Sequence, residues 1–174
     1  PFSAPITLAG TSISVRGAAL ADINGDGLLD FMTAATLIPI KANASKLFLN
    51  NLGALTGPGT TIGSGQVLAD ILVADINLDG RLDRIFDYFP AILPAVRSPQ
   101  LSLQKLDGSF DTPISLPDDL PGKTSMAIAD FNGDGFPDLY YGFGGSIASE
   151  IADVLYVGNG AGGFVPNGWT GATT

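Results

Sequence analysis

The sequence DINGDGLLD, at residues 22–30, recurs in modified form twice more along the chain, as DINLDGRLD at 75–83 and DFNGDGFPD at 130–138. Each copy places Asp at positions 1, 5 and 9, Asn at position 3 and Gly at position 6. Nine of the 17 acidic residues lie in these three loops, so the acids are clustered rather than spread over a surface. The three loops therefore indicate an internal repeat.

A second landmark repeats with the same step. The first aspartates of the loops are 53 and 55 residues apart, and a large apolar residue keeps a similar spacing at Phe2, Leu55, Phe110 and Phe164. Two independent markers with one period predict a structural repeat. We divide a single domain, residues 1–174, into an outer strand (1–11) and three repeats (12–65, 66–122 and 123–174).

Short apolar runs surround each loop. In the third repeat, Met126–Ala129 precedes the loop, Leu139–Tyr141 follows it, Val154–Val157 comes later, and a Gly-rich turn leads to Phe164. Runs of this length, bounded by Gly, Pro, Asn and Asp, predict strands rather than helices. Four strands in about 54 residues is the size of one propeller blade. The sequence therefore predicts an all-β fold of three four-stranded, propeller-blade-like repeats.

The loop spacing predicts one calcium site in each repeat, and up to three Ca2+ ions in all. Calcium takes about six to eight oxygen ligands, which a short loop with a sharp Gly turn can arrange around one ion. The candidate ligands are the side chains at positions 1, 3, 5 and 9 and the backbone carbonyl at position 7. They are Asp22, Asn24, Asp26, Leu28 and Asp30; Asp75, Asn77, Asp79, Arg81 and Asp83; and Asp130, Asn132, Asp134, Phe136 and Asp138.

Two other structures are typical of Asp- and Gly-rich loops: the EF-hand and the hairpin turn. An EF-hand needs a bidentate Glu at position 12 and flanking helices, whereas position 12 is Thr33, Phe86 or Tyr141. A hairpin turn held by Asp and Asn hydrogen bonds remains open as an alternative. That alternative leaves unexplained why three acids, which repel one another without a cation, recur at one spacing. Loop two is the least regular, because Leu78 stands where the others have Gly.

Composition limits the remaining chemistry. The chain has no Cys and no His, which excludes thiolate and imidazole metal ligands and Ser-His-Asp catalysis. A formal net charge of −9 argues against nucleic acid and anionic membranes as partners, and no apolar run is long enough for membrane insertion. Because the clustered carboxylates are assigned to metal, we expect no enzyme. The chain starts at Pro1 without a signal-peptide pattern, so we expect a mature product or an excised piece.

The third repeat resembles a known family. The stretches ADFNGDGFPDL at 129–139 and LYVGNGAGGF at 155–164 are similar to the FG-GAP or VCBS repeat of integrin α-subunit propellers and many bacterial surface proteins. The resemblance spans nearly the whole chain and departs from the pattern at 53–55, where Gly-Ala-Leu replaces Gly-x-Phe. It implies a calcium loop between the first two strands of each blade and an extracellular or cell-surface location. It implies no particular ligand.

Three classes of function remain open. The first is a structural or adhesive protein, as a subunit of an extracellular assembly or filament, with a protein surface as partner. The second is a lectin-like glycan binder, for which Trp169 beside Tyr156 is the candidate sugar platform. The third is a piece of a larger propeller-containing surface protein or polysaccharide lyase.

The repeat number also predicts self-association. Three blades are too few to close a propeller ring. The segment 1–11 matches the fourth strand of a blade, while the last repeat loses that pattern after Pro166. Exposed strand edges are usually paired or covered. We therefore expect the N-terminal strand to complete the last blade of another copy, in a ring or an open filament, unless the chain belongs to a larger propeller.

Overall fold

The computed structural model describes residues 13–37, 45–52, 54–55, 58–63, 67–88, 98–116, 123–143 and 153–170. Within these ranges the chain forms fourteen strands and no helix, which confirms the predicted all-β class. None of the described residues belongs to a helix that could cross a membrane. The predicted N-terminal strand, residues 1–11, lies outside the described residues.

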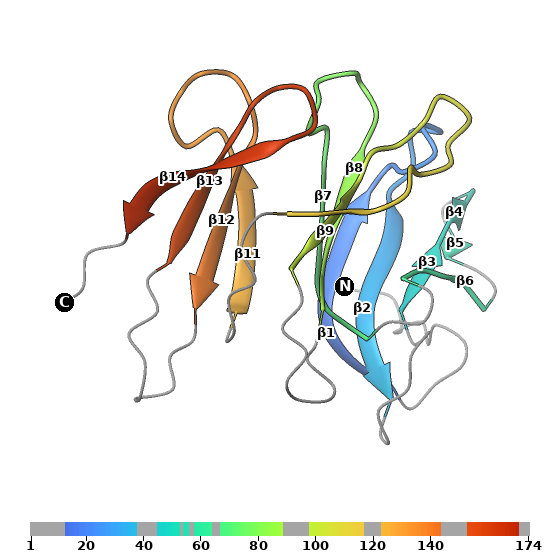
Figure 1. Cartoon of the computed structure of the whole chain (residues 1–174). Helices are drawn as coiled ribbons and strands as arrows, with labels where there is room; N and C mark the ends of the chain where they lie inside the picture. Colours follow the sequence, from blue (N-terminus) through green and yellow to red (C-terminus); the bar gives the residue numbers. More distant parts are fainter. Residues whose placement is uncertain are drawn as a thin grey trace, which may run out of the picture.

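Three four-stranded antiparallel sheets follow one another along the chain and stand side by side (Figure 1). The first contains β1 (Ile13–Ala21), β2 (Asp30–Leu37), β3 (Lys46–Phe48) and β6 (Thr60–Thr61). The second contains β7 (Leu68–Ala74), β8 (Asp83–Tyr88), β9 (Gln100–Ser102) and β10 (Ile114–Ser115). The third contains β11 (Lys123–Ala129), β12 (Asp138–Phe143), β13 (Val154–Gly158) and β14 (Phe164–Thr170). A separate hairpin joins β4 (Asn50–Asn51) to β5 (Ala54–Leu55).

The same connection joins the first two strands of every sheet. The residues that close it pair as Ala21–Asp30, Ala74–Asp83 and Ala129–Asp138. Position 9 of each loop is therefore the first residue of the second strand. Strands on both sides of the loop agree with the exclusion of an EF-hand. All three loops lie at one edge of the sheets, at the top of Figure 1.

The apolar landmark of each repeat has a fixed pairing partner at the end of the third strand or just beyond it. Leu55 pairs with Asn50, Phe110 bridges to Gln104, and Phe164 pairs with Gly158. The constant step of the landmark thus reflects a constant register. In the first repeat this pair forms the β4–β5 hairpin, and the outer strand of the sheet is β6 instead.

The outer strand of the third sheet differs from the sequence-based expectation. We expected the strand pattern to end after Pro166, but β14 continues to Thr170 along β13. A register irregularity between Val154 and Tyr156 lets the strand continue past the proline. Proline is tolerated there because an edge strand leaves one row of its backbone groups unpaired.

The first strand of each four-stranded sheet (β1, β7 and β11) contains a register shift at the equivalent position. The shifts lie between Val15 and Gly17, Leu68 and Asp70, and Lys123 and Ser125. A bulge of this kind increases strand twist and redirects a side chain. At Gly17 the reason for glycine is direct, because a Cβ there would lie 2.2 Å from Oδ1 of Asp70 on the neighbouring sheet.

Two hydrophobic cores hold the three sheets together, one between each pair of neighbouring sheets. We call the face of a sheet that packs on the next sheet its trailing face, and the opposite face its leading face. The first core joins Met32 on the trailing face of the first sheet to Ile71 and Phe86 on the leading face of the second. The second core joins Ile85 to Leu139 and other residues of the third sheet. The array is thus held by burial between successive sheets.

The outermost faces of the array carry exposed apolar side chains. Position 2 of the loop is buried at Ile23 (6% exposed) and Ile76 (2%), whereas Phe131 on the trailing face of the third sheet is 51% exposed. On the leading face of the first sheet, Leu20 is 63% exposed. Among the described residues, these two faces lack the neighbour that covers the equivalent positions elsewhere in the chain.

Candidate metal centre

The first aspartate of each loop accepts two backbone N–H groups from the far side of the loop. In loop one, Oδ1 of Asp22 accepts the N–H of Asp26 (3.0 Å) and Oδ2 accepts that of Gly27 (2.8 Å). The same two bonds form at Asp75, at 3.0 and 2.8 Å, and at Asp130, at 3.2 and 2.9 Å. Position 1 therefore curls the loop around its own carboxylate.

Positions 3 and 5 complete this ring. In loop one, Oδ1 of Asn24 accepts the N–H of Asp26 (3.1 Å), and its amide donates to Oδ2 of Asp26 (2.9 Å). Oδ1 of Asp26 then accepts the N–H of Leu28 (2.9 Å), so position 7 contributes its N–H to the ring. Loops two and three repeat the pattern. The structure thus brings together the predicted residues at positions 1, 3, 5 and 7.

Two left-handed residues make the turn. Position 6 has φ of 84° at Gly27, 83° at Gly80 and 90° at Gly135. Position 4 is also left-handed, and in loop two it is Leu78 at φ 57°. A residue with a Cβ costs roughly 1–2 kcal/mol there, because the Cβ crowds the following carbonyl oxygen. The irregularity seen in the sequence of loop two is therefore a real backbone strain.

Position 9 is placed apart from the other predicted ligands. The side chains of Asp30, Asp83 and Asp138 are 1% exposed or less. In the second repeat, Oδ2 of Asp83 accepts the N–H of Ile76 (2.9 Å) and Oδ1 accepts that of Gln104 (2.8 Å). Equivalent pairs of bonds form at Asp30 and Asp138. Each position-9 carboxylate thus ties the loop to the residue at the end of the third strand or just beyond it.

In loop two, burial dominates the electrostatics of the position-9 carboxylate, Asp83. Desolvation raises the pKa of Asp83, and the N–H groups of Gln104 and Ile76 oppose this rise. The carboxylates of Asp79 and Asp75 add a smaller upward push, because like charges disfavour ionisation. Loop two therefore carries mutual repulsion among its acids, which a cation in the loop would relieve.

The donor set matches a hard cation, but the side chains are turned onto backbone N–H groups. Within the described segments, no group of three or more acidic, His or Cys side chains is gathered to hold a metal. This pose is the hydrogen-bonded turn that the sequence left open as an alternative. The chemistry still fits calcium, because carboxylate and amide oxygens are its ligands.

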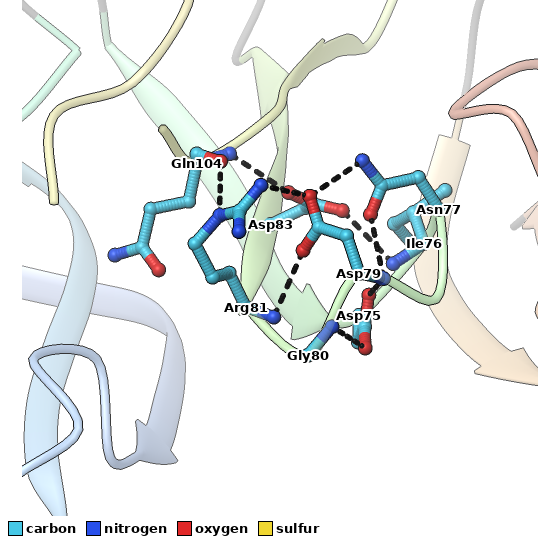
Figure 2. Close-up of polar contacts among 8 residues, drawn as sticks. All are labelled: Asp75, Ile76, Asn77, Asp79, Gly80, Arg81, Asp83 and Gln104. Carbon is cyan, nitrogen blue, oxygen red and sulfur yellow. Dashed lines mark hydrogen bonds and ion pairs between the residues drawn. The ribbon is translucent and has the colours of Figure 1, made fainter. Parts of the chain in front are cut away.

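Around loop two there are three contacts that the sequence did not predict, and Figure 2 shows the two made by Arg81. The guanidinium of Arg81 forms an ion pair with Asp79, and its Nε donates to the backbone carbonyl of Gln104 (3.0 Å). The side chain of Gln104 donates to the carbonyl of Ile23 in loop one (2.8 Å). The loop pattern predicts only a backbone role for Arg81 and gives no sign of Gln104, which the structure pairs with the Phe110 landmark.

The prediction that Tyr156 and Trp169 form a sugar-binding platform is wrong for Tyr156. Tyr156 is 2% exposed and packs edge-on against Tyr141 in the second core, with ring centroids 6.1 Å apart. A buried ring offers no face to a sugar. The side chain of Trp169 lies outside the described residues.

Comparison with known proteins assigns no family. No protein-family model matches the sequence, and a search of curated proteins finds no similar sequence. The interpretation of the loops therefore rests on their own residues and geometry.

Proposed function

We propose that this chain is a calcium-binding structural or adhesive module of the extracellular space, built as a β-propeller-type array with one Ca2+ in each loop. The observation that supports it most is the threefold recurrence of one loop geometry. In all three loops an exposed ring of carboxylate and amide oxygens sits at the same edge of its sheet. A turn alone needs one Asp and a Gly, and does not require three acids each time.

Charge supports the same proposal. The chain carries a formal charge of −9, and its acids are concentrated in the loops. Three divalent ions would add six positive charges and leave −3. In each loop the aspartates at positions 1 and 5 would turn from N–H donors to the ion. The bound ion supplies the positive charge that holds these oxygens together.

The test is calcium-dependent stability with loop-specific variants. A ligand at 100 times its Kd adds about 2.7 kcal/mol per independent site, so melting with excess calcium should exceed melting with chelator by many degrees. Asp26→Ala and Asp134→Ala should each remove one ion in calorimetry. The matched control is Asp107→Ala, an exposed turn aspartate outside the loops. Identical melting curves with and without calcium, and unchanged stoichiometry, would leave the aspartates as turn formers.

Self-association belongs to the proposal as well. The trailing face of the third sheet and the leading face of the first are the two halves of a contact that the chain already makes twice internally. We propose that a second copy supplies the missing neighbour at each end, giving a ring or a filament. Pairing by residues 1–11 remains a prediction, and its test is the loss of assembly, with calcium binding retained, when these residues are removed.

A further inference from the structure

Loop two contains a cation of its own. Position 7, which is apolar in the other loops (Leu28 and Phe136), is Arg81 in loop two. Its guanidinium reaches back over the loop to Oδ2 of Asp79, the position-5 carboxylate (Figure 2). That same oxygen also accepts the amide of Asn77 (2.9 Å). A resident positive charge therefore lies on one of the oxygens that calcium would need.

The arginine is held in place from a second side. Its Nε donates to the backbone carbonyl of Gln104, 3.0 Å away. Gln104 is itself buried and fixed, because its N–H donates to Asp83 and its side chain donates to Ile23 of loop one. An isolated surface ion pair contributes little, since two long side chains must be ordered to form it. Here the guanidinium fork is oriented by a rigid backbone carbonyl, so less ordering remains to be done.

From this geometry we infer that Arg81 closes loop two without a metal, and that loop two binds calcium more weakly than loops one and three. The inference rests on the proposed function for the comparison among loops. Calcium entering loop two must displace the guanidinium from Asp79 and then coexist with a positive charge tethered beside the site. A single positive charge about 6 Å from a divalent ion in a water-like dielectric weakens binding about tenfold.

Loop two also differs from the other two loops at position 4. Leu78 holds a left-handed backbone at φ 57°, where loops one and three have Gly25 and Gly133. The backbone of loop two is therefore strained at a position where the other two loops are not. The Arg81–Asp79–Gln104 contacts are present only in this loop among the described residues.

Calcium titration of the full chain tests the inference. For the unaltered protein we expect two sites of similar affinity and a third about tenfold weaker. Arg81→Leu, which restores the residue of loop one, should strengthen the weak site about tenfold. Lys105→Leu is the matched control: it removes one positive charge next to Gln104, from an ion pair with Asp111 that lies outside the loops, and should leave the titration unchanged.

A metal-free measurement separates this inference from calcium binding itself. In chelator, Arg81→Leu and the milder Arg81→Gln should lower the melting temperature, because the resident cation is lost. In saturating calcium the order should reverse. Three equal sites in the unaltered chain, with no effect of Arg81→Leu in either condition, would overturn the inference while calcium binding stands. No calcium binding in any variant would instead overturn the proposed function, whatever the chelator melts show.

Discussion

Aspartate residues lie in two different electrostatic environments in this chain. The loop aspartates at positions 1 and 5 face solvent, whereas Asp70 lies between sheets at the shifted position of β7. It accepts the N–H of Ile71 (2.8 Å) and contacts the backbone of Gly17 on the first sheet. Its partner across β7–β8 is the buried Asp87. Burial raises the pKa of Asp70, and the N–H groups of Ile71 and Met126 only partly offset this rise.

Asp70→Asn should therefore stabilise the protein at neutral pH. A carboxyl whose pKa is raised on folding binds more protons in the folded state, so stability falls as pH rises through the window from the ordinary carboxyl pKa of 3.8 to the raised pKa of folded Asp70. Above the window ionised Asp70 is a cost, and Asn removes the charge while keeping an acceptor oxygen. Denaturant unfolding in chelator should show the variant more stable at pH 7 and equal to the unaltered chain near pH 3.

The control for this experiment is Asp107→Asn. Two hydrogen bonds from Ser109 lower the pKa of the exposed Asp107, and the bond from the side chain has a larger effect than the bond from the backbone. Its replacement should bring no gain at neutral pH. An Asp70→Asn variant that is less stable than the unaltered chain at pH 7 would show that the carboxylate is needed for its hydrogen bonds rather than tolerated.

At this scale the sequence predicted residue types better than residue contacts. The turn at position 6 and the irregular Leu78 follow from local backbone preferences, which are written in a few adjacent residues. The contact between Gln104 and Ile23 joins residues 81 positions apart, so no local pattern announces it. The loop pattern predicts no role for the side chain of Arg81, because the ligand expected at position 7 is the backbone carbonyl.

Among elements, the position-9 aspartate connects the first hairpin to the third strand. In the third sheet, Oδ2 of Asp138 accepts the N–H of Phe131 and Oδ1 accepts that of Gly158, both at 2.9 Å. Gly158 is closely packed, because a Cβ there would lie 2.1 Å from the carbonyl oxygen of Pro137. One carboxylate thus satisfies two backbone donors from two elements. Buried donors of this kind are costly to leave without an acceptor.

Asp138→Ala should accordingly cost more than Asp134→Ala in the absence of calcium. The first change leaves two N–H groups without their acceptor, at about 1–3 kcal/mol each. The second removes bonds in an exposed ring where water can replace the acceptor, so we expect a cost of about 1 kcal/mol or less. Urea unfolding in chelator measures both. Equal costs would contradict a structural role of position 9 larger than that of position 5.

The sequence predicted the strands beside the loops accurately and the outer strands of the sheets less well. The strands beside the loops are long and apolar, because each packs at least one face against a neighbouring sheet. The outer strands β6 and β10 contain two residues each, and β14 contains a proline. Such strands are selected by one neighbouring strand, so their register depends on tertiary contacts rather than on a sequence pattern.

The whole molecule is an array whose contact repeats. Ala19 in the first sheet and Leu72 in the second pack against the next sheet, and Ala127 is the equivalent residue on the exposed trailing face of the third. Exposed apolar faces of this kind usually mark an interface. Because the two end faces differ, the contact proposed between two copies would be head-to-tail, and such contacts form rings or open filaments. The sequence predicted self-association from its repeat number, whereas the choice of sheet faces comes from the structure.

Complementary variants can test that assembly directly. Ala127→Glu places a charge on the trailing face of the third sheet, and Leu20→Glu places one on the leading face of the first. Each variant alone should be monomeric in sedimentation velocity at micromolar concentration, because burying an unpaired charge is costly. An equimolar mixture should form a one-to-one dimer, since one intact pair of faces remains. The control Ile114→Glu changes a residue of similar exposure on the outer strand β10 and should leave assembly intact. An unaltered chain that is monomeric under these conditions would contradict a second copy as the neighbour, and dimers of either single variant would contradict the head-to-tail contact.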